Sequence, residues 1–316
     1  MKRTILIFFL LILIFSGCSK QKTEKQEESE LPNIDALWDY QYPDSTEIKF
    51  RALVPEIKSS GNTDYYLQLL TQIARTQGLQ RKFEDAHKTL NEVDSLLTDN
   101  TKTAKIRYLL ERGRTFRSSG FPEKAKLLFL KAWDFGITNK LDLYAIDAAH
   151  MMGIVEPPEK QLDWNLKALE LCEKTEDKRA KGWLGPLYNN IGWTYHDLEE
   201  YEKALELFQK GRKWREEIKD EHGTMIAKWT VARTFRSLGK LDEALEIQLA
   251  LEKEYEEQQL GQDGYIFEEL AEIYLLKEQE EEAKKYFGLA YEYLSQDQWL
   301  ADNEPERLAR LKELSE

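Results

Sequence analysis

A pattern of small and large residues recurs about six times along this chain, and it limits the fold more than any other feature. One copy, WTYHDLEEYEKALELF, occupies residues 193–208. Close variants surround Ala125, Ala244 and Ala283. Repeats of this size are typical of solenoids, in which each unit packs on its neighbours and the stack presents an extended surface.

Two small positions, twelve residues apart, define the register of each copy. The earlier position holds Ala74, Gly113, Ala149, Gly192, Ala232 and Ala271. The later position holds Ala86, Ala125, Gln161, Ala204, Ala244 and Ala283, at intervals of 36 to 43 residues. Small residues at both positions allow two antiparallel helices to approach closely, and large residues such as Phe116 and Tyr195 fill the space between pairs. The register therefore predicts a stack of helical hairpins.

This register resembles the tetratricopeptide repeat over residues 61–294. The intervals exceed the roughly 34 residues of the common repeat, so the helices are expected to be long. The resemblance implies an all-α, right-handed superhelical solenoid of about six long helical hairpins. Residues 33–60 and 295–316 fit the N-terminal and C-terminal caps of such a stack.

The third copy departs most clearly from the pattern. Gln161 replaces the small residue, and Pro157 and Pro158 restrict the turn before it. From Trp38 onward the chain is also similar to a group of bacterial tetratricopeptide proteins of uncharacterised function, on segments such as LLTQIARTQGLQ and LYNNIGWTYHD. This similarity supports the fold and supplies no activity.

The N-terminus predicts export and lipid attachment. Two basic residues precede an apolar run over residues 5–15. This run is too short for a membrane span of about 20 residues but suits the core of a signal peptide over residues 1–17. The sequence FSGC at residues 15–18 resembles the lipobox of bacterial lipoproteins, which implies a lipid on Cys18. The alternative is an ordinary secretory signal with an incidental cysteine.

Residues 18–32 lack apolar periodicity and predict a disordered tether between the lipidated cysteine and the repeats. The lipoprotein resemblance places the protein in the bacterial cell envelope, and Ser19 implies the outer membrane where a cell has two membranes. Cys172 is the only other cysteine in the sequence, so we expect a buried, unreactive thiol and no disulfide. The net charge of −13 argues against nonspecific nucleic-acid binding, which needs a basic surface.

The first helix of each tetratricopeptide hairpin lines a concave surface, and we call its predicted surface positions the groove stripe. In the fourth copy, Asn189, Trp193 and His196 share one helical face because they are spaced i, i+4, i+7. The candidate ligand-binding residues of the other copies are Arg75, Arg107, Arg114, Arg117, His150, Trp229, Arg233 and Arg236. The remaining stripe residues are Gln68, Gln72, Asp147, Glu268, Glu269 and Glu272.

Six arginines and no lysine on the stripe allow two interpretations. The planar guanidinium suits carboxylates and phosphates and stacks on rings such as Trp193, so the stripe could bind an anionic or mixed-charge peptide. Alternatively, the arginines pair with acidic residues of neighbouring helices and stiffen the solenoid. The acidic candidates for such pairs are Glu111, Asp147, Asp197 and Glu268.

The sequence contains no HExxH, phosphate-binding glycine loop or GxSxG motif, so we expect no enzyme, no cofactor and no metal. An acid–base or metal site formed by His150 and His196 with a neighbouring aspartate is the remaining catalytic alternative. The predicted function is a membrane-tethered scaffold or adaptor that binds a protein or peptide partner, acidic in character. The alternative is a sensory module for a small anionic ligand, which a closed pocket around Trp193, His196 and Trp229 would favour.

Overall fold

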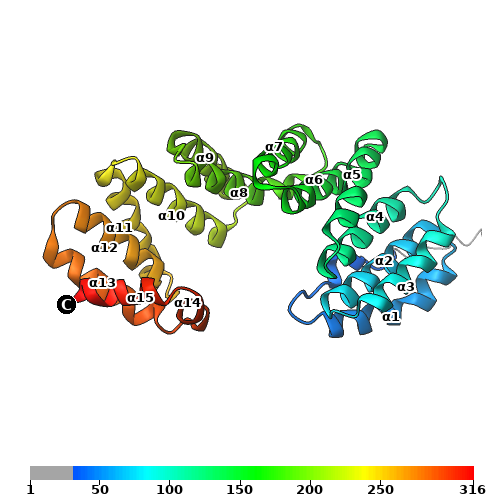
Figure 1. Ribbon diagram of the computed structural model, residues 1–316, viewed down its shortest axis with the longest axis horizontal. Helices are drawn as coiled ribbons and strands as arrows, with labels where there is room; N and C mark the ends of the chain where they lie inside the picture. The colour runs from blue at the N-terminus through cyan, green and yellow to red at the C-terminus, as the bar shows by residue number, and fades with distance from the viewer. Residues whose placement is uncertain (1–30) are drawn as a thin grey trace, which may run out of the picture. The chain divides into compact units, whose positions relative to one another are not determined.

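Each copy of the repeat forms one antiparallel helical hairpin in the computed structural model, which describes residues 31–316 (Figure 1). The first helices are α2 (Thr63–Leu79), α4 (Lys102–Ser118), α6 (Asp142–Val155), α8 (Leu184–Asp197), α10 (Glu221–Ser237) and α12 (Gly264–Leu276). The second helices are α3 (Phe83–Leu96), α5 (Pro122–Asn139), α7 (Pro158–Lys174), α9 (Tyr201–Glu217), α11 (Leu241–Glu257) and α13 (Glu280–Leu294). The predicted all-α solenoid is therefore confirmed over the described residues.

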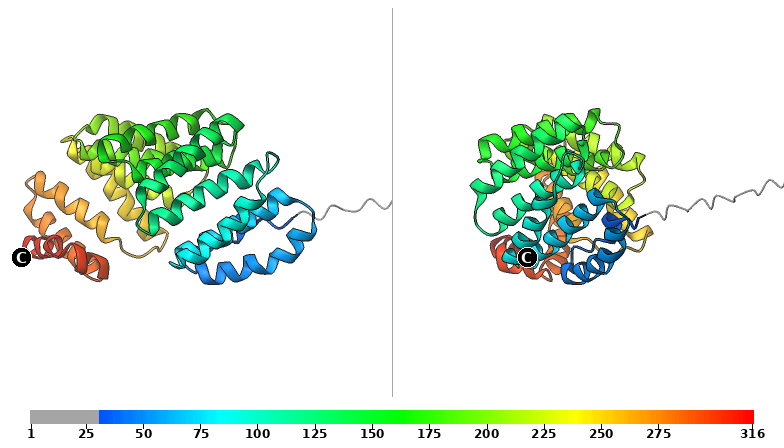
Figure 2. Two further views of the ribbon diagram at one scale, coloured as in Figure 1. Left: turned by 45° about the vertical axis from the view of Figure 1, so that its right-hand side comes forward. Right: turned by 90° about the vertical axis from the view of Figure 1, so that its right-hand side faces the viewer.

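Further helices flank the six hairpins. A short 3₁₀ helix, η1 (Ile34–Leu37), precedes α1 (Pro43–Ser59), and α1 packs on α2. At the other end, α14 (Gln298–Asn303) leads into α15 (Pro305–Ser315), which packs on α13. A second 3₁₀ helix, η2 (Ala180–Trp183), precedes α8. Residues 34–316 form one unit, in which each helix contacts the next along the stack (Figure 2).

Five of the six hairpins reverse through the same three-residue turn. Its middle residue has a positive φ and is Arg81, Gly120, Glu199, Gly239 or Glu278. In the fourth hairpin the amide of Glu200 donates to the carbonyl of Tyr195 at 2.9 Å, which satisfies the end of α8. The third hairpin turns differently because Pro157 has no amide hydrogen and the residue before it is extended. The sequence departure there thus has a direct structural counterpart.

The small positions lie where the two helices of a hairpin touch. A Cβ atom added to Gly192 would lie 2.5 Å from the Phe208 ring, and one added to Gly113 would lie 2.4 Å from the Phe129 ring. Ala204 is completely buried in the same contact region. The expectation that these residues serve helix packing is confirmed.

The fifth hairpin has a different core at the equivalent place. Gln248 occupies the position that Phe129 and Phe208 hold in the second and fourth hairpins. Its side chain is 0% exposed, and within residues 31–316 neither of its amide atoms has a hydrogen-bond partner. A buried amide without a partner costs about 1–3 kcal/mol. The core of the fifth hairpin therefore carries a polar cost at the position where the fourth hairpin has the Phe208 ring.

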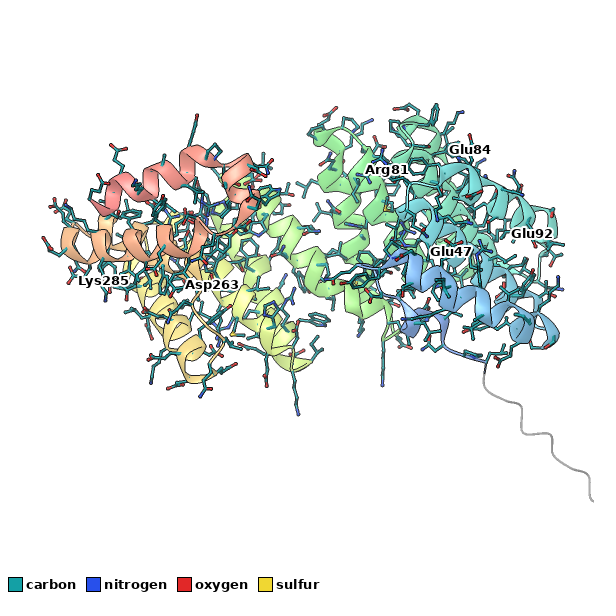
Figure 3. All side chains as sticks on the ribbon, turned by 90° about the horizontal axis from the view of Figure 1, so that it is seen from below. Glu47, Arg81, Glu84, Glu92, Asp263 and Lys285 are labelled. Atoms are coloured by element: carbon teal, nitrogen blue, oxygen red, sulfur yellow. The ribbon has the colours of Figure 1, made fainter. Side chains whose placement is uncertain are left out.

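Charged side chains cover the solvent-facing sides of the second helices. Glu84 and Glu92 on α3 and Lys285 on α13 are exposed (Figure 3). The opposite sides of these helices carry buried residues such as Leu90 and Phe287. Apolar residues on one side and charged ones on the other are what a helix packed on a solenoid requires.

Cys18 and residues 1–30 lie outside the described residues, so signal peptide and lipidation stay predictions. In residues 31–316 no helix is both long enough and apolar enough to cross a membrane. Cys172 is buried, as predicted, and its Sγ donates to the carbonyl of Ala180 at 3.2 Å. Burial and the charge of Glu173 raise the pKa of this thiol to about 12, which keeps it protonated and unreactive.

The Gly192–Phe208 contact gives a test of the hairpin packing. We expect Gly192→Ala to lower the free energy of unfolding by about 1–3 kcal/mol, because the new methyl group displaces the Phe208 ring. Gly182→Ala is the matched control, since a Cβ there meets nothing within 4 Å. Urea and thermal unfolding followed by circular dichroism measure both variants. Equal stability of the two variants would contradict the close contact.

Candidate functional site

The buried carboxylate of Glu111 holds two arginines of the groove stripe. Glu111, on α4, is 5% exposed. It accepts hydrogen bonds from Arg75 of α2 at 3.1 Å and from Arg114, one turn along α4, at 2.7 Å. Arg114 also pairs with Asp147 of α6. A buried carboxylate needs such partners, and these link three consecutive first helices.

The same charges determine the state of Arg114. Burial disfavours its charged form, but Asp147 and Glu111 outweigh burial and raise the pKa of the guanidinium. Arg107, one turn before Glu111 on α4, is also buried and pairs with Asp35 of η1. Both guanidiniums are thus held by carboxylates of the chain itself.

A second carboxylate plays the same part in the fifth and sixth hairpins. Glu269 of α12 is 2% exposed and pairs with Arg233 and Arg236 of α10. Arg236 makes two hydrogen bonds to it, at 2.8 and 3.0 Å. The next stripe glutamate, Glu268, pairs instead with Arg307 of α15. Arginine–carboxylate pairs therefore join α10 to α12 and α12 to α15.

Five of the six stripe arginines consequently have carboxylate partners within residues 31–316. Glu111 and Asp147 act as the internal-pairing interpretation predicts. Two other expected partners do not: Glu268 binds the C-terminal helix, and Asp197 is exposed and forms no ion pair among the described residues. Arg117 is exposed and is the one stripe arginine without an ion pair in this part of the chain. The arginine row of the sequence is largely neutralised in the structure.

Arg117 lines a small cavity of about 190 Å³ with several charged residues, which we call the arginine pocket. Its charged residues are Arg75, Glu111, Arg114 and Arg117. Leu79 and Ile154, each more than a third exposed, lie at the same cavity. Its three guanidiniums outnumber the carboxylates of Glu111 and of Asp147, which pairs with Arg114, so this part of the stripe keeps a net positive charge.

The stripe residues of the fourth and fifth hairpins form an aromatic cluster of Trp193, His196 and Trp229. The Trp193 ring centroid lies 5.1 Å from that of His196 and 6.2 Å from that of Trp229. His196 Nε2 is 2.9 Å from the Ser237 hydroxyl, and the indole NH of Trp229 donates to the carbonyl of Tyr265 at 3.2 Å. All three rings are partly exposed. The sequence register correctly brought these three residues together.

The two remaining stripe candidates, His150 and Asn189, have other neighbours. His150 is half-buried with its ring 5.1 Å from that of Trp183, and its Nδ1 has no hydrogen-bond partner among the described residues. Asn189 donates to the side chain of Asn190 at 3.4 Å and borders a space of only about 10 Å³. Within residues 31–316, no three histidine, cysteine or acidic side chains are placed to hold a metal ion.

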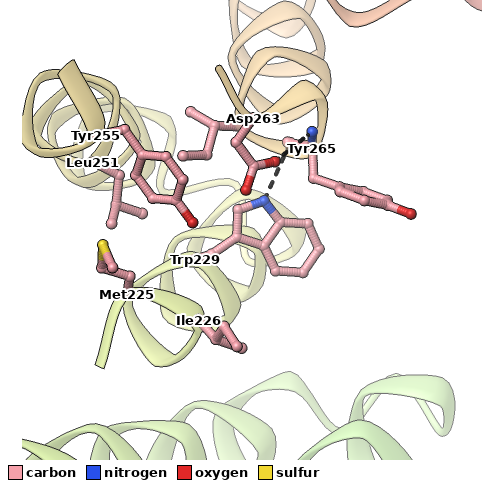
Figure 4. Close-up of a pocket in the computed structure, with 8 residues that line it drawn as sticks. Met225, Ile226, Trp229, Leu251, Tyr255, Asp263 and Tyr265 are labelled. Atoms are coloured by element: carbon pink, nitrogen blue, oxygen red, sulfur yellow. Dashed lines mark hydrogen bonds between the residues drawn. The ribbon is translucent and has the colours of Figure 1, made fainter. Parts of the chain in front are cut away.

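A larger apolar cavity of about 270 Å³ opens beside Trp229, and sequence reasoning missed most of its residues (Figure 4). We call it the Trp229 pocket; it is lined by Met225, Ile226, Trp229, Leu251, Tyr255, Asp263, Tyr265 and Ile266. Neither Trp193 nor His196 lines it, so it differs from the closed pocket that a small-ligand sensor would favour. The signal that could have revealed it is a comparison of equivalent positions between repeats, where the fifth has Glu254 in place of Trp214 of the fourth.

His150 gives a pH-dependent test of this geometry. Burial, with the charge of Arg114, lowers the pKa of His150 despite the opposing effect of Asp147. The unfolded chain therefore takes up a proton at a higher pH than the folded chain, and stability falls as the pH drops through about 6.5. His150→Phe removes this loss. Thermal unfolding should show the variant gaining on the wild-type protein between about pH 7.5 and 5.5. A difference that stays constant with pH would contradict the burial of the imidazole.

Comparison with known proteins supports the repeat assignment. Residues 183–252, which span α8 to α11, match the family model of the tetratricopeptide repeat. No curated protein sequence matches the chain. Among solved structures, the apo form of RapI is similar, with a TM-score of 0.65, 13% identity and coverage of 84% of this chain and 76% of that one.

Two further structures show the same likeness. A signal transduction ATPase with numerous domains (STAND) protein with a tetratricopeptide repeat sensor, from Pyrococcus horikoshii, gives a TM-score of 0.64 at 16% identity, covering 90% of this chain and 44% of that one. Aspartyl phosphate phosphatase F from Bacillus subtilis gives 0.50 at 15% identity, covering 84% of this chain and 73% of that one. At these identities the likeness concerns the fold alone. This likeness and the matched family model together support the assignment of the chain as a tetratricopeptide-repeat protein with an all-α solenoid fold.

Proposed function

We propose that this protein is a noncatalytic scaffold or adaptor, tethered to a membrane of the bacterial envelope through a lipid on Cys18, that holds a segment of a partner protein on its groove stripe. The tetratricopeptide fold is consistent with a protein-interaction scaffold. The observation that carries the proposal is the aromatic cluster. Two partly exposed tryptophans, Trp193 and Trp229, face each other from adjacent hairpins. Exposed tryptophans of this kind are enriched at the centres of protein interfaces.

The arginine pocket supplies the charge that such a partner would meet in the N-terminal hairpins. Arg75 and Arg114 already bind Glu111, so an incoming carboxylate finds one guanidinium without an ion-pair partner in the described chain, that of Arg117. Leu79 and Ile154 add exposed apolar surface at the same place. This combination fits a segment of mixed character, with an acidic side chain beside an apolar one, better than a long acidic run.

A second candidate function is the binding of a small anion in the arginine pocket, as part of a sensory module. The lining by Arg75, Arg114 and Arg117 favours it. Pockets for drug-sized ligands usually measure about 300–1,000 Å³. At about 190 Å³, the arginine pocket would hold one carboxylate or phosphate group. A protein partner agrees better with the additional aromatic cluster, which a small anion would leave unused.

The partner proposal predicts crosslinks from the stripe. A photoreactive phenylalanine derivative at Trp193, in the full-length protein expressed in its own cells, should give discrete adducts with one or a few proteins. The same group at Lys210, exposed on α9, is the matched control and should give none of them. Arg117→Glu should weaken the Trp193 adducts, whereas Lys88→Glu, an exposed reversal on α3, should not. Adducts that form equally from Lys210 would contradict partner binding on the stripe.

The tether has its own test. Cys18→Ala should abolish the incorporation of labelled palmitate, since the chain loses the thiol that carries the predicted lipid. Cys172→Ala is the matched control and should keep the label, because that thiol is buried inside the hairpins. Metabolic labelling followed by immunoprecipitation measures both variants. Label that persists in Cys18→Ala would disprove lipid attachment at this residue.

A further inference from the structure

The Trp229 pocket has an apolar floor and an accessible rim. Met225, Leu251 and Ile266 are at most 5% exposed and form the floor. Ile226 and Tyr265 are 43% and 38% exposed and lie at the opening. These residues come from α10, α11 and the start of α12, so the pocket lies between the fifth and sixth hairpins (Figure 4).

The repeat register explains why the pocket occurs in the fifth hairpin. Seven residues before the earlier small position, the fourth and sixth hairpins carry Gly185 and Gly264. In each case a large side chain of the second helix covers the glycine: a Cβ on Gly185 would lie 2.7 Å from Trp214, and one on Gly264 would lie 2.7 Å from Leu294. The close contact between first and second helix leaves no room for a pocket there.

The fifth hairpin has Met225 in place of that glycine and Glu254 in place of Trp214. Glu254 pairs with Lys228 of α10 at 2.6 Å and brings no ring to the first helix. The ring that fills this space in the fourth hairpin is therefore missing, and the apolar cavity remains. Large apolar residues also stand at the Met225 position in the first and second hairpins, so the replacement peculiar to the fifth hairpin is Glu254, where the other five carry an apolar or aromatic residue. An apolar cavity beside this one polar replacement points to binding, since a plain structural repeat would keep the space filled.

The walls of the pocket are fixed in position. The indole NH of Trp229 donates to the carbonyl of Tyr265, 3.2 Å away in the next hairpin. Burial and the carboxylate of Asp263 raise the pKa of Tyr255 to about 12, so its hydroxyl keeps its proton. Both rings are held before any ligand arrives, which lowers the entropy lost on binding.

Asp263 places a negative charge beside this apolar surface. It precedes α12 and accepts a hydrogen bond from the amide of Tyr265 at 2.9 Å (Figure 4). No lysine, arginine or histidine of residues 31–316 forms an ion pair with it. The whole chain carries a net charge of −13. A ligand with a cationic group next to an apolar group therefore complements the pocket and its rim.

We propose that the Trp229 pocket binds an apolar side chain of the partner segment, and that a lysine or arginine next to this side chain pairs with Asp263. The inference rests on the proposed scaffold function and names the chemistry of its partner. The volume of about 270 Å³ suits one large side chain. Because Trp229 belongs to both the pocket and the groove stripe, a segment on the stripe reaches the pocket without leaving the surface.

Short peptides test the chemistry directly. The probes are N-acetyl-Phe-Lys-amide, N-acetyl-Phe-Glu-amide and N-acetyl-Ser-Lys-amide, titrated into the full chain labelled with 5-fluorotryptophan. The ¹⁹F resonance of Trp229 is assigned by its loss in Trp229→Phe. We expect the Phe-Lys probe to shift this resonance saturably and to bind about 2- to 5-fold more tightly than the Phe-Glu probe, as an accessible ion pair allows. The Ser-Lys probe should not shift it.

Two variants separate the charge from the cavity. Asp263→Asn keeps a side chain that caps α12 and removes the charge, so the preference for Phe-Lys over Phe-Glu should disappear while both still bind. Glu254→Trp restores the ring of the fourth hairpin and should abolish binding of every probe. Thermal unfolding of each variant confirms that it is folded, and Asp263→Asn remains decisive if Glu254→Trp does not fold.

Each other result overturns the inference. Tighter binding of Phe-Glu, an unchanged preference in Asp263→Asn, or an unshifted Trp229 resonance would disprove it. Self-association of the chain that shifts Trp229 and excludes the probes would assign the pocket to a second copy. Adducts from Trp193 without probe binding would leave the scaffold function standing and remove this pocket from it. Probe binding without adducts from Trp193 would leave the chemistry of the pocket standing and remove the scaffold function.

Discussion

The close approach of two helices within each hairpin is the constraint on which the rest of the structure depends. Gly192 lies directly beneath the Phe208 ring, and Gly113 lies beneath Phe129 in the same way. This contact fixes the rotation of both helices about their axes. It thereby determines which residues of a first helix face the next hairpin and which remain on the groove stripe.

The rotation also decides what the charges of the stripe do. In the sequence, six arginines suggest a positive surface. In the structure, Glu111 and Glu269 lie buried among them, and together with Asp35 and Asp147 they pair with five of the six arginines. Buried carboxylates with guanidinium partners hold adjacent hairpins in register, and breaking one would leave an uncompensated charge. What remains for a ligand is Arg117 at one place and aromatic and apolar surface at another. Most of the stripe arginines thus join the repeats, and the proposed partner would meet Arg117 and the aromatic and apolar surface.

Much of the fold could be predicted because the hairpin contact repeats. The register gave the six hairpins, the irregular turn at Pro157 and the grouping of Trp193 with His196 and Trp229. The ion pairs were harder to predict, because the two partners lie on different helices and the side chains of adjacent residues point toward different helices. Glu269 turns toward α10, whereas Glu268 turns toward α15. The Trp229 pocket was missed for another reason. It depends on the absence of a large side chain, because Glu254 stands where the fourth hairpin has Trp214, and a search for unusual residues on the stripe does not reveal an absence.

The buried amide of Gln248 has a consequence for how the stack behaves as a whole. In a linear array, stability is a sum of contributions from each unit and from each contact between neighbours. The fifth unit contains both an amide without a hydrogen-bond partner in the described chain and an incompletely filled boundary with the sixth. Both features lower the stability of the fifth unit and of its boundary with the sixth, which the pairs of Glu269 with Arg233 and Arg236 still hold together. A ligand bound at this boundary would stabilise the contact between the fifth and sixth units, so the cooperativity of unfolding would increase with the fraction of protein that has ligand bound.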